Sequence, residues 1–122
     1  MIVEIELSGN VPSKKNSRIN LSSGKSIPSA KYRAWRNAAL WQVKQQTRHL
    51  FTKPVKLEVV VYFSTKIRAD LDNRVTSILD MLVDALVLQD DKWQNVPEIH
   101  AKAEYRQHQP GALIRLIEIE KQ

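Results

Sequence analysis

The stretch that most constrains how this chain folds is Asp70-Leu71-Asp72-Asn73 together with the apolar run after it. From Asp72 to about Leu88, apolar side chains recur at helical spacing and fall on several sides of the helix. They are Val75, Ile78, Leu79, Met81, Leu82, Val83, Ala85, Leu86, Val87 and Leu88. A helix this apolar is buried by more than one neighbour, and in so small a protein another subunit is a candidate neighbour.

The acidic residues around this helix predict a metal site. In an extended segment Asp70 and Asp72 lie on one side, while Leu71 points the other way. Like charges so close repel each other unless a cation neutralises them. A second acidic pair, Asp90-Asp91, follows the helix, and the chain has no cysteine. Ligands that are all oxygen suit Mg²⁺ or Mn²⁺.

A structural role competes with this interpretation. Asp72 stands where the helix begins, and Asp is a favoured N-cap. Taken alone, Asp72 is therefore read as a cap, whereas Asp70 has no such role because capping needs one residue. Asp80 and Asp84 lie on the polar side of the helix and are expected to be solvated or paired. The three histidines lack metal-ligand spacing.

Charge is unevenly distributed along the chain, whose net charge is +6. Residues 1–56 carry eleven Lys and Arg against two Glu, and residues 57–122 carry eight against eleven acidic residues. This asymmetry predicts a phosphate-binding face opposite a metal-binding centre. A solvated basic surface is the alternative. The absence of cysteines and of long apolar runs favours a cytoplasmic protein without a membrane partner.

The patterning predicts a single α+β domain over residues 1–122: a small mixed β-sheet with two main helices, dimeric. Strands are expected at 2–7, 56–64, 98–107 and 112–120, with the last two joined as a hairpin around Pro110-Gly111. Helices are expected at 29–49, with Ser29 as N-cap, and at 72–88. Residues 10–29 are rich in Ser, Asn, Lys, Gly and Pro and predict a structureless, mobile, basic loop.

The basic loop and the first helix predict a DNA-binding surface. Arg33, Arg36, Lys44 and Arg48 share one side of that helix. Its opposite side carries Tyr32, Trp35, Ala38, Ala39, Val43 and Leu50. The three tryptophans, Trp35, Trp41 and Trp93, are expected in the core or an interface. The predicted DNA-binding residues are Lys14, Lys15, Asn16, Arg18, Arg33, Arg36, Lys44, Lys66 and Arg68.

The string DLDNRVTSILDMLVDALVLQDDKWQNV resembles the RusA-type Holliday junction resolvases, small phage and bacterial endodeoxyribonucleases. That family shares a D-x-DN motif opening a helix, an aspartate midway along it and an acidic pair just after it. Its N-terminal Pro-Ser-x-x-Asn-like loop is matched by Pro12-Ser13-Lys14-Lys15-Asn16, and its Tyr-Arg basic helix by Tyr32-Arg33. The resemblance covers nearly the whole chain.

The resemblance implies that Asp70, Asp72 and Asp91 are catalytic metal ligands, with Asp90 beside them, in a homodimer that cuts four-way DNA junctions. The family commonly has a Lys one turn into the helix, where this chain has Thr76. Arg74 is the nearest cation and our candidate for phosphate binding there.

We therefore expect an Mg²⁺-dependent endodeoxyribonuclease that hydrolyses phosphodiesters of branched DNA in paired positions. Two alternatives stay open: a non-catalytic DNA-binding module with a structural acidic cluster, and a metal phosphohydrolase acting on a small nucleotide.

The length of the second helix predicts that each site is built from two subunits. A helix from Asp72 to Leu88 holds its ends roughly 24 Å apart. Three further residues can return only about 11 Å, so Asp91 does not reach Asp70 in its own chain. Antiparallel pairing of two such helices, over a surface around Met81, Val83 and Val87, would bring them together.

Overall fold

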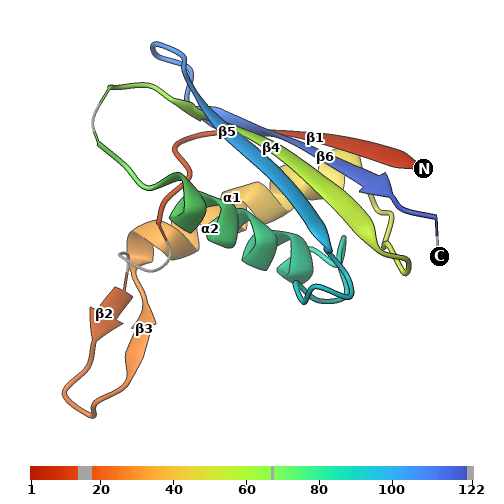
Figure 1. Ribbon diagram of the computed structural model, residues 1–122. Helices are drawn as coiled ribbons and strands as arrows, with labels where there is room; N and C mark the ends of the chain where they lie inside the picture. Colours follow the sequence, from red (N-terminus) through yellow and green to blue (C-terminus); the bar gives the residue numbers. More distant parts are fainter. Residues whose placement is uncertain (14–17, 67, 121–122) are drawn as a thin grey trace.

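The computed structural model describes residues 1–13, 18–66 and 68–120, and nothing of the Arg18 side chain. Its elements, in chain order, are β1 (Ile2–Ser8), β2 (Arg18–Asn20), β3 (Ser26–Pro28), α1 (Ala30–Gln46), β4 (Val55–Phe63), α2 (Leu71–Asp84), β5 (Glu98–Tyr105) and β6 (Gly111–Glu118). Within these residues, four strands form one sheet in the order β1-β6-β4-β5, and both helices cover one face of it (Figure 1). The predicted α+β class is confirmed.

The sheet is mixed, because β4 pairs with β5 in parallel while its other pairings are antiparallel. The chain leaves β4, crosses the sheet through α2 and returns as β5, which accounts for the parallel pair. The predicted hairpin of the last two strands is wrong, since β4 lies between β5 and β6. Pro110-Gly111 instead brings β6 beside β1, so closely that a Cβ on Gly111 would clash with the Leu7 carbonyl oxygen.

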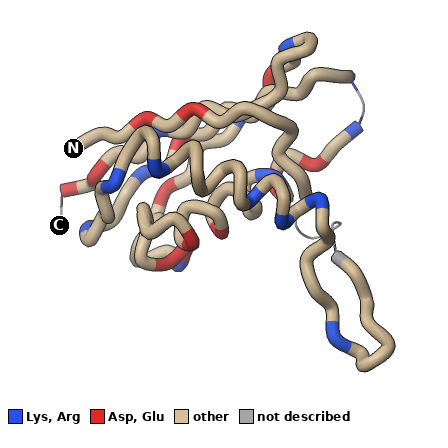
Figure 2. Tube along the Cα trace, turned by 180° about the vertical axis from the view of Figure 1, so that it is seen from behind, with Lys and Arg blue, Asp and Glu red and all other residues tan. Residues whose placement is uncertain are grey.

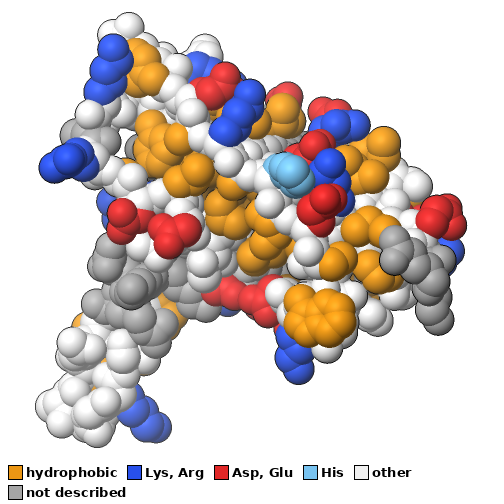
Figure 3. All heavy atoms as spheres, in the orientation of Figure 1, with side chains coloured by type: hydrophobic (Ala, Val, Ile, Leu, Met, Phe, Trp, Pro, Cys, Tyr) orange, Lys and Arg blue, Asp and Glu red, His pale blue; other side chains and the backbone are white. Residues whose placement is uncertain are grey.

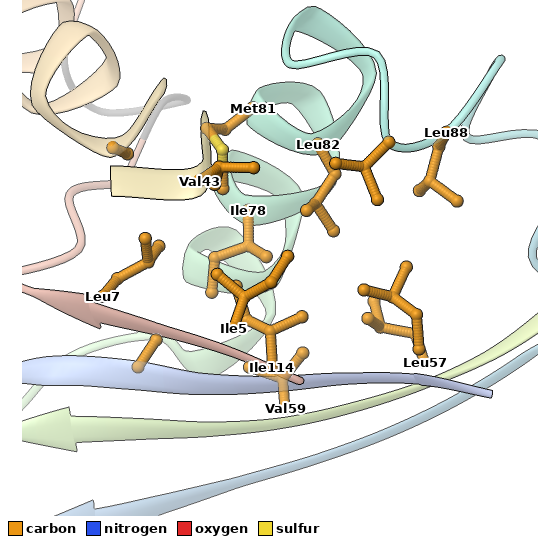
Figure 4. Packing of buried hydrophobic residues seen from close by; sticks show 14 of the residues in the cluster. Ile5, Leu7, Val43, Leu57, Val59, Ile78, Met81, Leu82, Leu88 and Ile114 are labelled. Carbon is orange, nitrogen blue, oxygen red and sulfur yellow. The ribbon is translucent and has the colours of Figure 1, made fainter. Parts of the chain in front are cut away.

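The core lies between the sheet and the helices (Figure 4). Alternate residues of β4, namely Val55, Leu57, Val59 and Val61, are buried against it. Ile78, Met81 and Leu82 of α2 are fully buried, as are Val87 and Leu88 just after it. The predicted dimer surface around Met81, Val83 and Val87 is therefore wrong, because the chain itself covers Met81 and Val87.

Both helices end earlier than the sequence predicts. Ser29 is confirmed as the N-cap of α1, since its hydroxyl accepts from the Tyr32 N–H at 3.1 Å. Helix α1 ends at Gln46, which leaves Arg48 beyond it, and α2 ends at Asp84 rather than near Leu88. Neither helix of the described ranges is long and apolar enough to cross a membrane.

The interval 10–29 is not structureless, contrary to the prediction. Strands β2 and β3 pair antiparallel, with Ile19 opposite Ile27, and form an arm that projects from the body (Figure 1). The turn is closed by a bond from the Leu21 N–H to the Lys25 carbonyl, and Gly24 takes a φ of 86° within it. Lys14, Lys15 and Asn16 lie outside the described residues.

The two edges of the sheet differ in how their backbone groups are satisfied. Gln46 of α1 bonds both the N–H and the carbonyl of Glu6 in β1 at 2.7 Å. Gln42 accepts from the Ser8 N–H at 2.8 Å. Among the described side chains, none makes a comparable bond to the backbone of β5, and every residue of β5 is exposed. The β1 edge is closed, and the β5 edge is open.

Candidate active site

The start of α2 presents two carboxylates held by one asparagine. Asp70 is the N-cap residue, with extended backbone, and Leu71 and Asp72 are already helical. The expectations that Asp72 is the cap and that the pair lies on an extended segment are therefore wrong. Asp70 makes no side-chain cap bond; its Oδ2 accepts from Asn73 Nδ2 at 3.1 Å. The Oδ1 of Asp72 accepts from the Asn73 N–H at 2.9 Å.

Buried contacts fix this end of the helix against the rest of the protein. Leu71 packs on the core, and Ser77 is fully buried. The Ser77 hydroxyl donates to the Pro12 carbonyl at 2.7 Å, which fastens the N-terminal Pro-Ser segment to α2. Thr76, at the position of the family lysine, donates back to the Asp72 carbonyl at 3.1 Å. The carboxylates thus stand on a rigid element, with their oxygens exposed.

Arg74 points towards the sheet. Its Nη1 donates to the Asp70 carbonyl at 3.1 Å, and its guanidinium lies 5.8 Å from the centre of the Phe63 ring. Its Nε is buried and has no hydrogen-bond partner among the described residues. Arg74 therefore borders the acidic end of α2 from the side of β4.

The second acidic pair lies near the other end of α2. The Asp91 N–H donates to Asp90 Oδ1 at 2.8 Å, and this bond holds the pKa of Asp90 below its usual value. The pKa of Asp91 is raised, first by loss of solvent, then by its bond with Asp90 and by the charge of Asp80. Asp91 therefore lies near Asp80, which stands in the second half of the helix.

One chain keeps the two acidic groups apart. Asp80 follows Asp72 by eight residues, which is about 12 Å along a helix. Among the described residues, no three His, Asp or Glu side chains gather as ligands for one metal. The carboxylates are nevertheless of the kind that Mg²⁺ binds, because all of them are oxygen ligands.

The predicted DNA-binding residues differ in their exposure and in their contacts. Basic residues lie along α1 and on the projecting arm (Figure 2). Arg33 and Lys44 are exposed, as is Arg68. Arg36 is engaged with Asp84, with Nη1 3.1 Å from Oδ2, and Lys66 lies 4.9 Å from the centre of the Tyr105 ring. Arg74 and Lys31 line one cavity together with Ala69, the residue before Asp70.

The aromatic predictions hold only in part. Trp35 is buried, but Trp41 and Trp93 expose 65% and 73% of their surface, so neither lies in this chain's core. Ala38 and Leu50 are exposed as well, and the buried side of α1 reduces to Tyr32, Trp35, Ala39 and Val43. The poor fit of Trp41 to the apolar side of α1 is the sequence signal of its exposure.

Comparison with protein-family models shows which family the chain belongs to. The model of the endodeoxyribonuclease RusA matches residues 9–117, nearly all of the 122 residues. The chain belongs to the RusA endodeoxyribonuclease family. The match spans β4, α2 and β5, and with them both acidic groups of the candidate site. No curated protein sequence matches the chain. Membership in the RusA family supports a nuclease of branched DNA junctions over a non-catalytic module.

Proposed function

We propose that this chain is an Mg²⁺-dependent endodeoxyribonuclease that resolves four-way DNA junctions as a homodimer by paired phosphodiester hydrolysis. One observation carries the proposal: in a RusA-family chain, α2 has carboxylates near both ends, and a single chain holds them too far apart for one site. The site is complete only when a second copy supplies the missing group.

The open edge of β5 is the surface we propose for dimerisation. An exposed strand edge is a template for another strand, and proteins commonly protect it. Gln42 and Gln46 protect β1 in this way, whereas β5 is left bare. Two copies of β5 paired antiparallel about a two-fold axis near Ala101 would satisfy both edges and extend the sheet.

The face of β5 that looks towards the helices supports this arrangement. Ile99, Ala101, Ala103 and Tyr105 pair in register with residues of β4 whose side chains face the helices. They remain exposed, and Ile99 and Tyr105 expose 44% and 47% of their surface. Figure 3 shows a band of hydrophobic side chains between β5 and α2. In the partner subunit, α2 lies over the partner's β5. From there it would cover this band.

This pairing would also complete the site. Helix α2 contacts both β4 and β5, so the two-fold axis would set two α2 helices side by side and antiparallel. Asp70 and Asp72 of one subunit would then face Asp91 of the partner subunit. Two equivalent sites, related by the two-fold axis, would act on the two symmetric strands of a junction.

In the proposed site Asp70, Asp72 and Asp91 would hold the divalent cation, with Asp90 beside them. When bound, the cation supplies positive charge to the phosphate and polarises the attacking water. Asn73 fixes the Asp70 carboxylate through the 3.1 Å bond. Arg74 and, on α1, Arg33 and Lys44 bind backbone phosphates without reading sequence. The hydrogen bond from the Asp91 N–H favours the charged form of Asp90 and lowers its pKa.

A cleavage and binding assay tests this function. Purified protein is incubated with a four-way junction and with linear duplex, in Mg²⁺ and in EDTA. We expect symmetric nicks in the junction alone, only with Mg²⁺. Asp70→Asn should abolish cutting and keep or tighten junction binding, because the lost charge repels phosphates. Junction binding without cutting at any metal concentration would indicate a DNA-binding module, and cutting by Asp70→Asn would remove Asp70 from the site.

A further inference from the structure

A cavity of about 320 Å³ adjoins the acidic end of α2. Ala69, which precedes Asp70, and Arg74 form the α2 side of its wall, and Lys31 from the first turn of α1 forms another side. Asn10, Ser13 and Ser64 also line it. Its volume is at the small end for ligand sites, which suits one nucleotide unit rather than a duplex.

The charged side chains that line this cavity, among the described residues, are all basic. Among the described residues that line it, Lys31 and Arg74 are basic and none is acidic. Neither cation forms an ion pair with a described carboxylate, unlike Arg36 and Arg115 of the same chain. Two basic side chains that line one cavity without an acidic residue in its wall favour an anionic ligand with oxygen acceptors.

The position of the cavity identifies the anion. Arg74 bonds the backbone of Asp70, so its guanidinium and the Asp70 carboxylate are fixed to the same turn of chain. The Ser77–Pro12 bond holds the opposite wall to α2. A DNA strand whose scissile phosphate lies at Asp70 and Asp72 would place a neighbouring phosphate beside this cavity. The start of α1, with its positive dipole end, borders the same space.

We infer that Lys31 and Arg74 form a second phosphate subsite, which holds a phosphodiester next to the scissile one and sets the strand's position over the carboxylates. This inference rests on the proposed function. It assigns Arg74 to a neighbouring phosphate rather than to the reacting one, and it adds Lys31 to the DNA-binding residues. Arg74 and Lys31 are positioning residues here.

The test is a double-mutant cycle between a side chain and a single phosphate. Four-way junctions carry one neutral methylphosphonate at each position flanking the cut, and single-turnover cleavage rates are compared. For the wild type, we expect one flanking position to slow cutting about tenfold, the loss of one charge-assisted contact. Arg74→Gln should slow the unmodified junction similarly, and the methylphosphonate at that position should then add almost nothing. Lys31→Gln, an exposed change that spares the core, should show the same coupling.

Lys53→Gln is the control, because Lys53 is an exposed cation that does not line the cavity. It should retain the full methylphosphonate effect. Independent, multiplicative effects for both Arg74→Gln and Lys31→Gln would overturn the subsite. The same cycle is measured as dissociation constants in EDTA, where no cutting is needed. Coupling in binding without any cleavage would support the subsite and reject the nuclease, so the two failures are distinguishable.

Discussion

At the scale of single residues, Asn73 connects the two carboxylates of the DxDN motif. Its side chain donates to Asp70 and its backbone N–H donates to Asp72, so both are oriented by one residue. Asp70 itself gives up the cap bond that Asp makes at many helix starts. The helix thereby loses a cap, and a carboxylate is left available for a ligand.

Asn73→Ala should lower the junction cleavage rate by about 10-fold to 100-fold, the usual effect of removing a residue that orients a metal ligand. The Mg²⁺ concentration for half-maximal rate should rise, while junction affinity in EDTA stays unchanged. Asn37→Ala, an exposed asparagine on α1, serves as the control. A variant with an unchanged Mg²⁺ requirement would show that the bond to Asp70 has no part in the site.

Tyr32 predicts a specific loss of stability in alkali. Burial, followed by the charges of Asp80 and Asp84, raises the pKa of Tyr32 to about 12 from 10.0. Between these values the unfolded chain releases the phenol proton and the folded chain keeps it. The free energy of unfolding should therefore fall by about 1.4 kcal/mol per pH unit above pH 10 from this group.

Urea denaturation of the wild type and Tyr32→Phe at pH 9 to 12 measures this component. The fall in the urea midpoint with pH should be shallower in Tyr32→Phe. Equal slopes for the wild type and Tyr32→Phe would contradict the assignment.

The sequence predicts which carboxylates stand at the start of α2, but it does not predict which of them is the helix N-cap. Asp is favoured at a helix start, but composition does not fix a boundary to one residue, so the cap was placed at Asp72 instead of Asp70. The buried bond between Ser77 and Pro12 joins residues 65 positions apart. No local pattern announces such a contact, and the cavity that it helps to shape was not predicted.

At the scale of elements, the alternation of apolar and polar residues predicted the strands of the main sheet, and helical periodicity predicted the two helices that cover it. Strand order escaped prediction because Pro110-Gly111 is a turn signal whichever strands it joins. The dimer surface was misplaced for a related reason. The apolar run of α2 predicts burial, but only the fold shows that its own chain covers Met81 while the helix-side face of β5 stays bare.

Ala101→Lys tests the β5 edge. A charge on each subunit close to the two-fold axis should weaken the dimer roughly 100-fold or more, since like charges there cost several kcal/mol. Sedimentation should give a monomer with unchanged helical circular dichroism, and junction cleavage should be lost. Ala38→Lys on the exposed surface of α1 is the matched control and should stay dimeric and active. A dimeric Ala101→Lys protein would reject this interface.

At the scale of the whole molecule, the net charge of +6 coexists with an acidic centre. Figure 2 shows basic positions along α1 and on the projecting arm, and Lys25, Arg33 and Lys44 are exposed there, as a face that receives a polyanion requires. Arg36 differs from the other basic residues of α1 named here, because it already forms an ion pair with Asp84. The structure thus separates the cations that are free to bind phosphate from Arg36, which is paired with α2.

The salt dependence of junction binding should report this separation. Arg33→Gln or Lys44→Gln should each reduce the slope of log affinity against log salt by about 0.9. Arg36→Gln should change the slope much less and should instead lower the urea midpoint. A reduction by Arg36→Gln as large as that by Arg33→Gln would show that Arg36 also contacts the DNA backbone.

Complementation between two inactive variants tests most directly whether each active site is built from two chains. Asp70→Asn and Asp91→Asn subunits are mixed, and heterodimers are purified through two different tags and assayed on a four-way junction with Mg²⁺. If the carboxylates act across the interface, each heterodimer has one intact site and one doubly damaged site. Nicking should then return to about half the wild-type rate per dimer. Complete inactivity of verified heterodimers would contradict the shared site, because each site would then lack one carboxylate of its own chain.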